Sequence, residues 1–132
     1  MHLRPVPFMF LFWSLAAQAQ HGIMANYSAD FFFGKYPTYQ QYLQLMQQAA
    51  TEHPQLCNID TIGASSQGRL ILSAKISANV MQDEMEPRVF LSSTMHGNET
   101  TGYYVLLRLV FYLLERYNAG DSTAVQLLNT TA

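Results

Sequence analysis

The chain has 132 residues, of which 49% are hydrophobic and 12% charged, and its formal net charge is -2 at pH 7. This length and apolar content suffice for one modest folded domain, and they exclude a disordered chain, a collagen-like repeat and a disulfide scaffold. The small net charge predicts no nucleic-acid partner and no anionic membrane surface as a partner.

The N-terminus has the layout of a secretory signal peptide. A single cation, Arg4, precedes an almost wholly apolar stretch over 8–17, and Ala17-Gln18-Ala19 fits a small-x-small cleavage site. This apolar stretch has only about half the length that spans a bilayer. We therefore expect residues 1–19 to be removed. The mature chain would then have no membrane span and would be exported, as a secreted, extracellular or periplasmic protein.

A leader segment and a helix follow the cleavage site. The mature chain is expected to begin near Gln20, and residues 20–34 show no period, so we assign them as a leader ahead of a folded part over 35–132. Thr38 is a candidate N-cap for a helix with apolar residues at helical spacing. The dipeptide His53-Pro54 is expected to end this helix, because a residue before proline is pushed out of the α region.

Two strands are expected next, at 56–62 and 70–76. They are joined by a turn of small and polar residues over 64–68, and their short separation predicts an antiparallel hairpin. The single cysteine, Cys57, falls in the first of these strands. We expect it to be a buried small hydrophobe, and we assign it no catalytic role.

A third strand is expected at Arg88–Ser93, after an acidic loop over 78–87. Its residues 89–91 form a short apolar run of the kind that is buried on both faces of a sheet. A long helix follows over 101–117, and Asp121 or Ser122 caps a final short helix. The long helix has a broad apolar face made of Tyr103, Leu106, Leu107, Val110, Leu113, Leu114 and Tyr117.

The order of these elements predicts an α/β fold in which helices cover a mixed sheet. Three strands are few for such a sheet, so we expect it to be incomplete. Much of the apolar face of the long helix would then stay exposed, which argues against independent stability of the chain.

One tight connection, between the third strand and the long helix, carries candidate metal ligands. It contains His96 and Glu99, and an imidazole nitrogen and a carboxylate oxygen are both good zinc ligands. Gly97 leaves room for an ion, and the helix dipole near Glu99 favours the ionised carboxylate that binds metal. The spacing alone does not decide the matter, because a surface histidine beside a helix-capping glutamate gives the same pattern.

Further landmarks along residues 36–129 occur in a fixed order. They are Tyr36-Pro37-Thr38-Tyr39, His53-Pro54, Ile62-Gly63, Gly68-Arg69, Glu86-Pro87, Met95-His96-Gly97-Asn98-Glu99, Gly102-Tyr103 and Leu127-Leu128-Asn129. Together they are more specific than any one of them. With these landmarks the chain resembles the zinc metallocarboxypeptidase family, the carboxypeptidase A/B-like enzymes, and the resemblance implies the incomplete N-terminal part of that fold and catalytic domain.

The resemblance also implies roles for individual residues. His96 and Glu99 match the family's first two ligands to one Zn²⁺ ion, and the third ligand, a histidine, is expected downstream of this chain. Arg69 matches an arginine that can contact the peptide substrate, although a solvated turn residue fits its position equally well. Thr94 and Asn98 are candidates for supporting the two ligands.

The function implied by the resemblance is release of C-terminal residues from a peptide or protein substrate with a free C-terminus. The family's general base and the residues that hold the substrate carboxylate are expected outside this chain, so we assign no catalytic residue within it. We expect a truncated chain that is inactive alone and binds zinc weakly.

Two alternatives remain open. One is a zinc-dependent deacylase or amidohydrolase on a similar scaffold, which downstream sequence would distinguish. The other is a secreted, non-catalytic fragment, which a cooperative thermal transition of residues 20–132 would favour.

Overall fold

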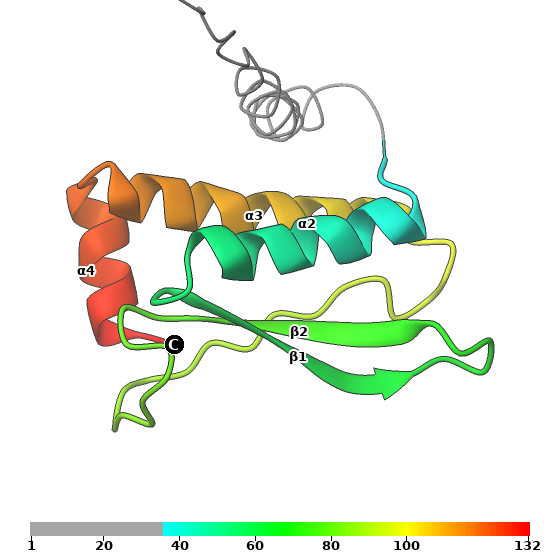
Figure 1. The fold of residues 1–132 in the computed structure, drawn as a ribbon, viewed down its shortest axis with the longest axis horizontal. Coiled ribbons are helices and arrows are strands. Elements are labelled where there is room, and N and C mark those ends of the chain that lie inside the picture. The colour runs from blue at the N-terminus through cyan, green and yellow to red at the C-terminus, as the bar shows by residue number, and fades with distance from the viewer. Residues whose placement is uncertain (1–35) are drawn as a thin grey trace, which may run out of the picture. The chain divides into compact units, whose positions relative to one another are not determined.

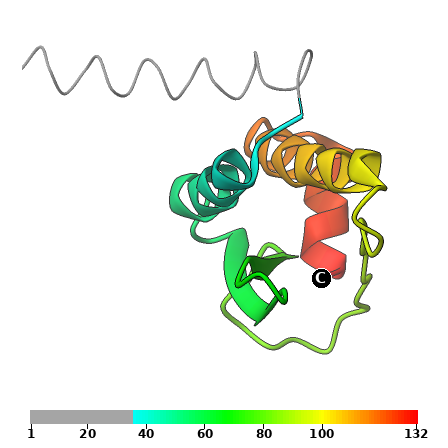
Figure 2. The ribbon, with the colours of Figure 1, turned by 90° about the vertical axis from the view of Figure 1, so that its right-hand side faces the viewer.

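Two helices lie side by side over one face of a β-hairpin in the computed structural model (Figures 1 and 2), which describes residues 36–132. The helices are α2 (Tyr39–Glu52) and α3 (Thr100–Asn118), and the strands are β1 (Cys57–Ala64) and β2 (Leu70–Ile76). A third helix, α4 (Ser122–Thr130), follows α3 and packs against it. Helices on a sheet confirm the predicted α/β class.

The predicted signal peptide and the predicted leader, over 1–34, lie outside the described residues. Within the described part, none of the helices combines the length and the apolar character that crossing a membrane requires. Residues 37–132 form one unit, which contains the predicted metal-binding loop and everything described below.

Helix α2 begins and ends where the sequence predicts. The Thr38 hydroxyl accepts a hydrogen bond from the Gln41 amide, and the Gln41 side chain accepts one from the Thr38 amide, so the two residues form a capping box. The helix ends at the C-cap His53, next to proline. The buried face of α2 is formed by Leu45, Met46 and Ala49, and the helix packs against β1.

The predicted antiparallel hairpin is confirmed, with changed bounds for its first strand, which begins at Cys57 instead of Leu56. Strand β1 does not stop at Gly63 but continues to Ala64, which pairs with Leu70. The register shifts between Thr61 and Gly63, so a β-bulge takes up the extra residue there. The turn consequently covers 65–69 instead of 64–68, and Gly68 provides its positive φ of 74°.

The third predicted strand is wrong for the described residues, because 88–93 is not assigned to any strand. Its side chains are also not buried, since Val89, Phe90 and Leu91 are 63%, 84% and 55% exposed. An apolar run becomes a strand only where a neighbouring backbone pairs with it. Here the backbone pairing is limited to two hydrogen bonds with Ala132, one from the Val89 amide and one to the carbonyl oxygen of Pro87, just before the segment.

The core lies between the helices and the hairpin, and it covers the long helix better than expected. Leu107 and Leu114 of α3 are buried, and the other five residues of its predicted apolar face are partly buried. The expectation that much of this face stays exposed is therefore wrong, because α2 and α4 both pack on α3. Phe111, which the sequence prediction left out of this face, is also buried.

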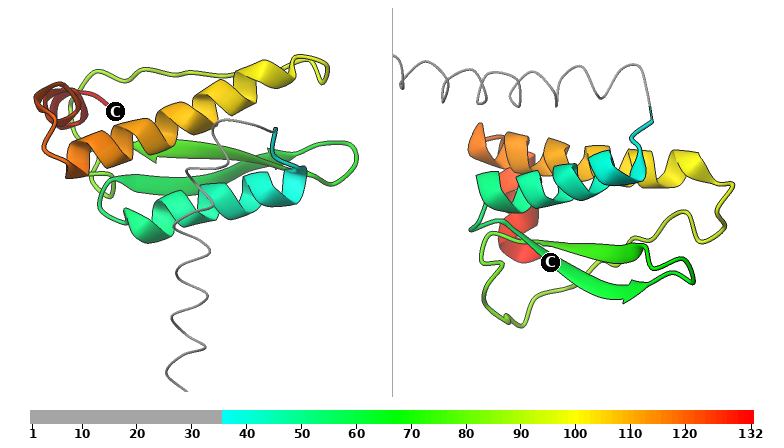
Figure 3. Two further views of the ribbon diagram at one scale, coloured as in Figure 1. Left: turned by 90° about the horizontal axis from the view of Figure 1, so that it is seen from above. Right: turned by 45° about the vertical axis from the view of Figure 1, so that its right-hand side comes forward.

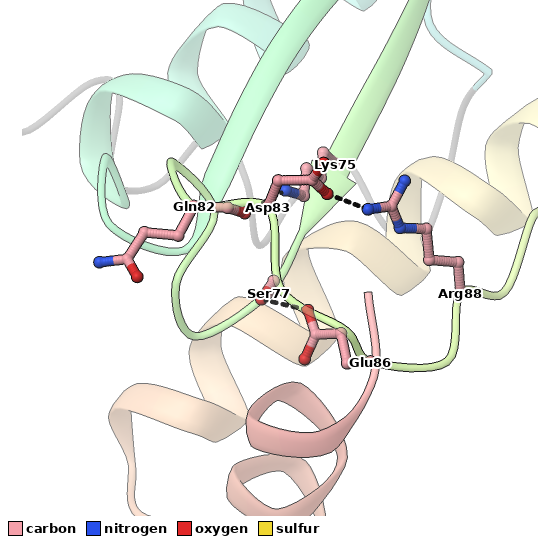
Figure 4. A network of polar contacts seen from close by, with 6 residues as sticks. All are labelled: Lys75, Ser77, Gln82, Asp83, Glu86 and Arg88. Atoms are coloured by element: carbon pink, nitrogen blue, oxygen red, sulfur yellow. Dashed lines mark hydrogen bonds and ion pairs between the residues drawn. The ribbon is translucent and has the colours of Figure 1, made fainter.

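The loop between β2 and residue 88 is held by its own polar side chains (Figure 4). The Ser77 hydroxyl, buried at 1% exposure, donates a hydrogen bond to the Glu86 carboxylate and accepts one from the Asn79 amide. The Lys75 ammonium donates to the Gln82 carbonyl oxygen at 2.9 Å, and an ion pair joins the exposed side chains of Asp83 and Arg88. These contacts give the acidic loop a defined path without regular secondary structure.

Cys57 is buried, as its position in the first strand predicts. The thiol is free and the residue is 2% exposed. Burial raises the pKa of this thiol to about 11, because a thiolate would lose its hydration there. Cys57 thus fills space at the start of β1, and its thiolate is disfavoured at neutral pH.

Candidate metal centre

The two predicted ligands lie in one turn at the start of α3. The Glu99 amide donates a hydrogen bond to the His96 carbonyl oxygen at 3.0 Å, which closes the turn, and both residues are exposed. Glu99 is the N-cap residue of α3, but its side chain makes no capping hydrogen bond. The carboxylate is therefore not used as a helix cap, and it stands where the helix dipole favours an anion.

Thr94 links the loop that precedes the turn to the first turn of the helix. Its hydroxyl donates to the Glu99 carbonyl oxygen at 3.0 Å and accepts from the Tyr103 amide at 3.1 Å. Thr94 also has a positive φ of 58°, which is unusual for a β-branched residue. This candidate supporting residue thus contacts the backbone of a predicted ligand, and the strained backbone marks a position that its surroundings hold in place.

A close contact between α3 and Ser93 also restrains the loop 94–99. A Cβ atom placed on Gly102 would lie 2.8 Å from the Cβ atom of Ser93. Real Cβ atoms do not approach so closely, so this contact requires glycine at the third position of α3. The Ser93 side chain therefore packs directly on the backbone of the first turn of α3, and this contact restrains both ends of the loop 94–99.

Aromatic residues anchor the start of α3 to the start of α2. The Tyr103 hydroxyl donates to the Pro37 carbonyl oxygen at 2.9 Å, and the Tyr103 ring meets that of Tyr42 edge to face, with centroids 6.4 Å apart. Burial raises the pKa of the Tyr42 hydroxyl, and a hydrogen bond with the Leu72 backbone opposes that rise. The sequence places Tyr103 on the apolar face of the long helix, and the spacing of residues within a helix gives no signal for a contact with another helix.

Arg69 lies in the turn between β1 and β2 and is exposed. Its guanidinium carbon is 5.7 Å from the centre of the Tyr39 ring, within the range of a cation–π contact. The Tyr39 hydroxyl also accepts a hydrogen bond of 2.6 Å from the Leu70 amide, so this tyrosine holds the turn from two sides. Figures 1 and 3 show the hairpin turn and the loop 94–99 at the same end of the unit.

The donors present suit zinc, but they do not complete a site. Among residues 36–132, no three side chains of histidine, cysteine, aspartate or glutamate lie close enough together to hold a metal ion. His53 is the C-cap residue of α2, at the end of that helix away from the loop 94–99 (Figure 1). Its Nδ1 atom forms a hydrogen bond of 2.7 Å with the Asn118 side-chain amide. Asn98 is exposed in the turn beside His96 and Glu99. The described residues thus offer two donors, and a catalytic zinc takes three protein ligands and an open position.

Comparisons with known proteins show which family the sequence matches. A family model described as zinc carboxypeptidase matches residues 42–132. The chain is 35% identical over 95 residues to carboxypeptidase Z of Mus musculus and 30% identical over 115 residues to carboxypeptidase Z of Homo sapiens. It is 32% identical over 88 residues to a zinc carboxypeptidase of Saccharothrix mutabilis subsp. capreolus. These alignments cover 71%, 86% and 67% of the chain but only 14%, 18% and 19% of the three relatives.

Proposed function

The chain belongs to the zinc carboxypeptidase family, and on that premise we propose that residues 35–132 are the N-terminal part of a metallocarboxypeptidase domain, with His96 and Glu99 as two ligands of one Zn²⁺ ion. The observation that carries this proposal is the hydrogen-bonded turn at the start of α3, in which the Glu99 carboxylate caps no backbone amide. A histidine and a carboxylate from one turn can bind the same ion. The third ligand would come from residues outside the described part.

Each residue of the turn has a separate task in this proposal. The His96 imidazole and the Glu99 carboxylate would each give a lone pair to the ion. Thr94 would keep the Glu99 backbone in place through its hydrogen bond to the Glu99 carbonyl oxygen. Held in this way, the carboxylate loses less conformational freedom when it binds the ion, because its backbone is fixed beforehand.

Arg69 would face the substrate. Its turn lies at the same end of the unit as the loop 94–99, and the contact with the Tyr39 ring limits the positions that the guanidinium can take. A guanidinium donates hydrogen bonds to carbonyl and carboxylate oxygens and stays charged at all physiological pH values. We assign it the binding of the peptide chain.

The substrate of the whole protein would be a peptide or protein with a free C-terminus, from which C-terminal residues are released by hydrolysis. Zinc, when bound, supplies a Lewis acid that polarises the scissile carbonyl group. In this proposal the chain's own residues hold the ion and orient the substrate. The general base and the group that binds the substrate's terminal carboxylate would lie outside these residues, so the 132 residues alone are expected to hydrolyse no peptide.

The zinc proposal predicts weak but specific binding by the 132-residue chain. Titration with Zn²⁺ should shift the NMR signals of the His96 ring and of the amides around Glu99. The variant His96→Ala should weaken this binding by about tenfold or more, because it removes half of the donors, and loss of a mere supporting residue already costs about 10–100-fold in affinity.

His53→Ala is the matched control, because His53 is the other histidine of the described residues and lies at the far end of α2. It should bind zinc as the parent chain does. Equal binding by the parent chain and His96→Ala, or zinc shifts that centre on His53, would contradict the assignment.

We propose in addition that the protein is exported, on the strength of the signal-like composition of residues 1–19. Expression in a host with a secretory pathway should give a mature chain that begins near Gln20, as measured by N-terminal sequencing or intact mass. A secreted product that retains Phe8–Ala17, or a product that stays inside the cell with Met1, would contradict cleavage.

A further inference from the structure

The backbone of Arg69 is held by the turn that carries it. The Ser65 amide donates a hydrogen bond to the Arg69 carbonyl oxygen at 2.8 Å, and the Arg69 amide donates to the Ser65 hydroxyl at 3.2 Å. The Gly68 amide also donates to the Ser65 carbonyl oxygen, at 2.9 Å. These bonds fix the backbone from which the guanidinium extends. They do not fix the long side chain, whose ordering costs conformational entropy.

One aromatic residue restricts the Arg69 side chain. The guanidinium carbon of Arg69 lies 5.7 Å from the centre of the Tyr39 ring, and the Tyr39 hydroxyl accepts a hydrogen bond of 2.6 Å from the amide of Leu70, the next residue. Tyr39 therefore contacts both the side chain of Arg69 and the backbone beside it. The two contacts use different parts of the tyrosine, because the ring makes the first and the hydroxyl makes the second.

The positive charge of Arg69 stays available for a ligand. Among residues 36–132, the ion pair that is present joins Asp83 to Arg88, so Arg69 has no carboxylate partner there, and its side chain is exposed. A contact with an aromatic ring orients a cation without neutralising it. A guanidinium held in this way can still donate hydrogen bonds to an oxygen acceptor.

Tyr39 is also part of a row of rings that reaches the candidate metal centre. The Tyr39 and Tyr42 rings are stacked with their centroids 6.4 Å apart, and the Tyr42 ring meets the Tyr103 ring edge to face. The Tyr103 amide donates to the Thr94 hydroxyl, which donates to the Glu99 carbonyl oxygen. Contacts between neighbouring residues thus link the place of the guanidinium to the turn that contains Glu99.

We propose that Tyr39 is a positioning residue for Arg69, whose ring holds the guanidinium at a set place relative to the candidate zinc ligands, where it binds a carbonyl oxygen of the peptide substrate. This inference rests on the proposed role of Arg69 in peptide binding, and it adds the residue that prepares the arginine for that role. The ring does the positioning, because it contacts the guanidinium, while the hydroxyl supports the backbone at Leu70. A side chain that is ordered beforehand loses less entropy on binding.

Two substitutions separate the ring of Tyr39 from its hydroxyl. Tyr39→Phe keeps the ring, and Tyr39→Leu loses both groups. In NMR spectra of the 132-residue chain, the side-chain protons of Arg69 should show an upfield ring-current shift in the parent and in Tyr39→Phe, and should lose it in Tyr39→Leu. The Leu70 amide should exchange about two- to tenfold faster in both variants, because both lose its hydrogen-bond acceptor.

Binding of a peptide provides the functional measurement. The probe is acetylated tetra-alanine with a free C-terminus, titrated into each variant and followed by the amide shifts of the turn 65–69. Tyr39→Phe should bind it as the parent does. Tyr39→Leu should bind about two- to fivefold more weakly, as loss of an exposed cation–π contact predicts. Arg69→Ala should bind more weakly still, because it loses the guanidinium itself.

Tyr112→Leu is the matched control, because the Tyr112 ring makes a similar contact with the Arg116 guanidinium, at 5.3 Å, elsewhere on the surface. It should leave the Arg69 proton shifts and the peptide binding unchanged. Loss of the ring-current shift in Tyr39→Phe, or its persistence in Tyr39→Leu, would overturn the inference. Equal peptide binding by Tyr39→Leu and the parent, with weak binding by Arg69→Ala, would overturn it as well.

A different result would count against the proposed function instead. If Arg69→Ala and the parent bind the peptide equally, or neither binds it, the role of Arg69 in peptide binding is wrong for this chain. The ring-current comparison does not depend on the peptide, so it would still decide whether Tyr39 holds the guanidinium.

Discussion

Replacing Leu114 by alanine is expected to lower the free energy of unfolding by about 3–5 kcal/mol, the range for large cavities in well-packed cores. The Leu114 side chain is 0% exposed and lies on the face of α3 that the neighbouring helices cover. The surrounding helices relax only partly into the space that the leucine side chain leaves, so most of its packing contacts are lost. Chemical denaturation followed by circular dichroism measures the change.

Val105→Ala is the control, because Val105 is on the same helix and 55% exposed. It should change the stability by about 0.5 kcal/mol or less, since surface substitutions away from special features have small effects. Equal losses in the two variants would mean that α3 is not packed in solution as the structure shows.

The covered face of α3 also changes how a thermal transition is interpreted. A cooperative transition was the observation that would favour a non-catalytic fragment over part of an enzyme. With Leu107, Phe111 and Leu114 all buried within residues 37–132, we expect cooperative unfolding for either kind of protein. The zinc titration of the His96 variants now discriminates better between the two.

Replacing Gly102 by valine is expected to lower the free energy of unfolding by about 1–3 kcal/mol, as overpacking of a tight contact does. The new Cβ atom would lie 2.8 Å from the Ser93 Cβ atom, so the segment or the first turn of α3 must move. Because that contact restrains both ends of the loop 94–99, the variant should also bind zinc more weakly than the parent chain. Denaturation and zinc titration measure the two effects.

Two variants separate the clash from other effects of valine in a helix. Thr100→Val introduces the same side chain two residues earlier, at an exposed position, and should have little effect on the free energy of unfolding. Combining Gly102→Val with Ser93→Gly removes the opposing Cβ atom and should recover part of the lost stability. If the double variant is no more stable than Gly102→Val, the contact with Ser93 does not explain the requirement for glycine.

The elements that could be predicted from the sequence are those whose signals are local. The structure confirms the capping residues of α2, the strand Leu70–Ile76 and the helical spacing of α3. Each of these signals is carried by residues that lie close together in the sequence. The strand at 88–93 could not be judged in this way, because a strand depends on a partner that is remote in the sequence. Its apolar run gave no information on what pairs with it.

The candidate site likewise combines features that a local motif predicts with features that depend on tertiary contacts. His96 and Glu99 were found from a short motif and its family context, and the structure places them in one turn, while their role as ligands stays a prediction. The interactions that hold this turn in place depend on tertiary contacts. Neither the positive φ of Thr94 nor the approach of Gly102 to Ser93 leaves a pattern in the residues next to them.

The hydroxyl of Thr94 has a consequence for redesign of this loop. Its oxygen atom donates a hydrogen bond to the Glu99 carbonyl oxygen and accepts one from the Tyr103 amide. Position 94 therefore needs a short side chain that both donates and accepts a hydrogen bond through a single atom. Among the common side chains only serine and threonine meet that requirement. A library that varies this connection to recruit a different cation should therefore leave position 94 as a hydroxyl residue and diversify its neighbours.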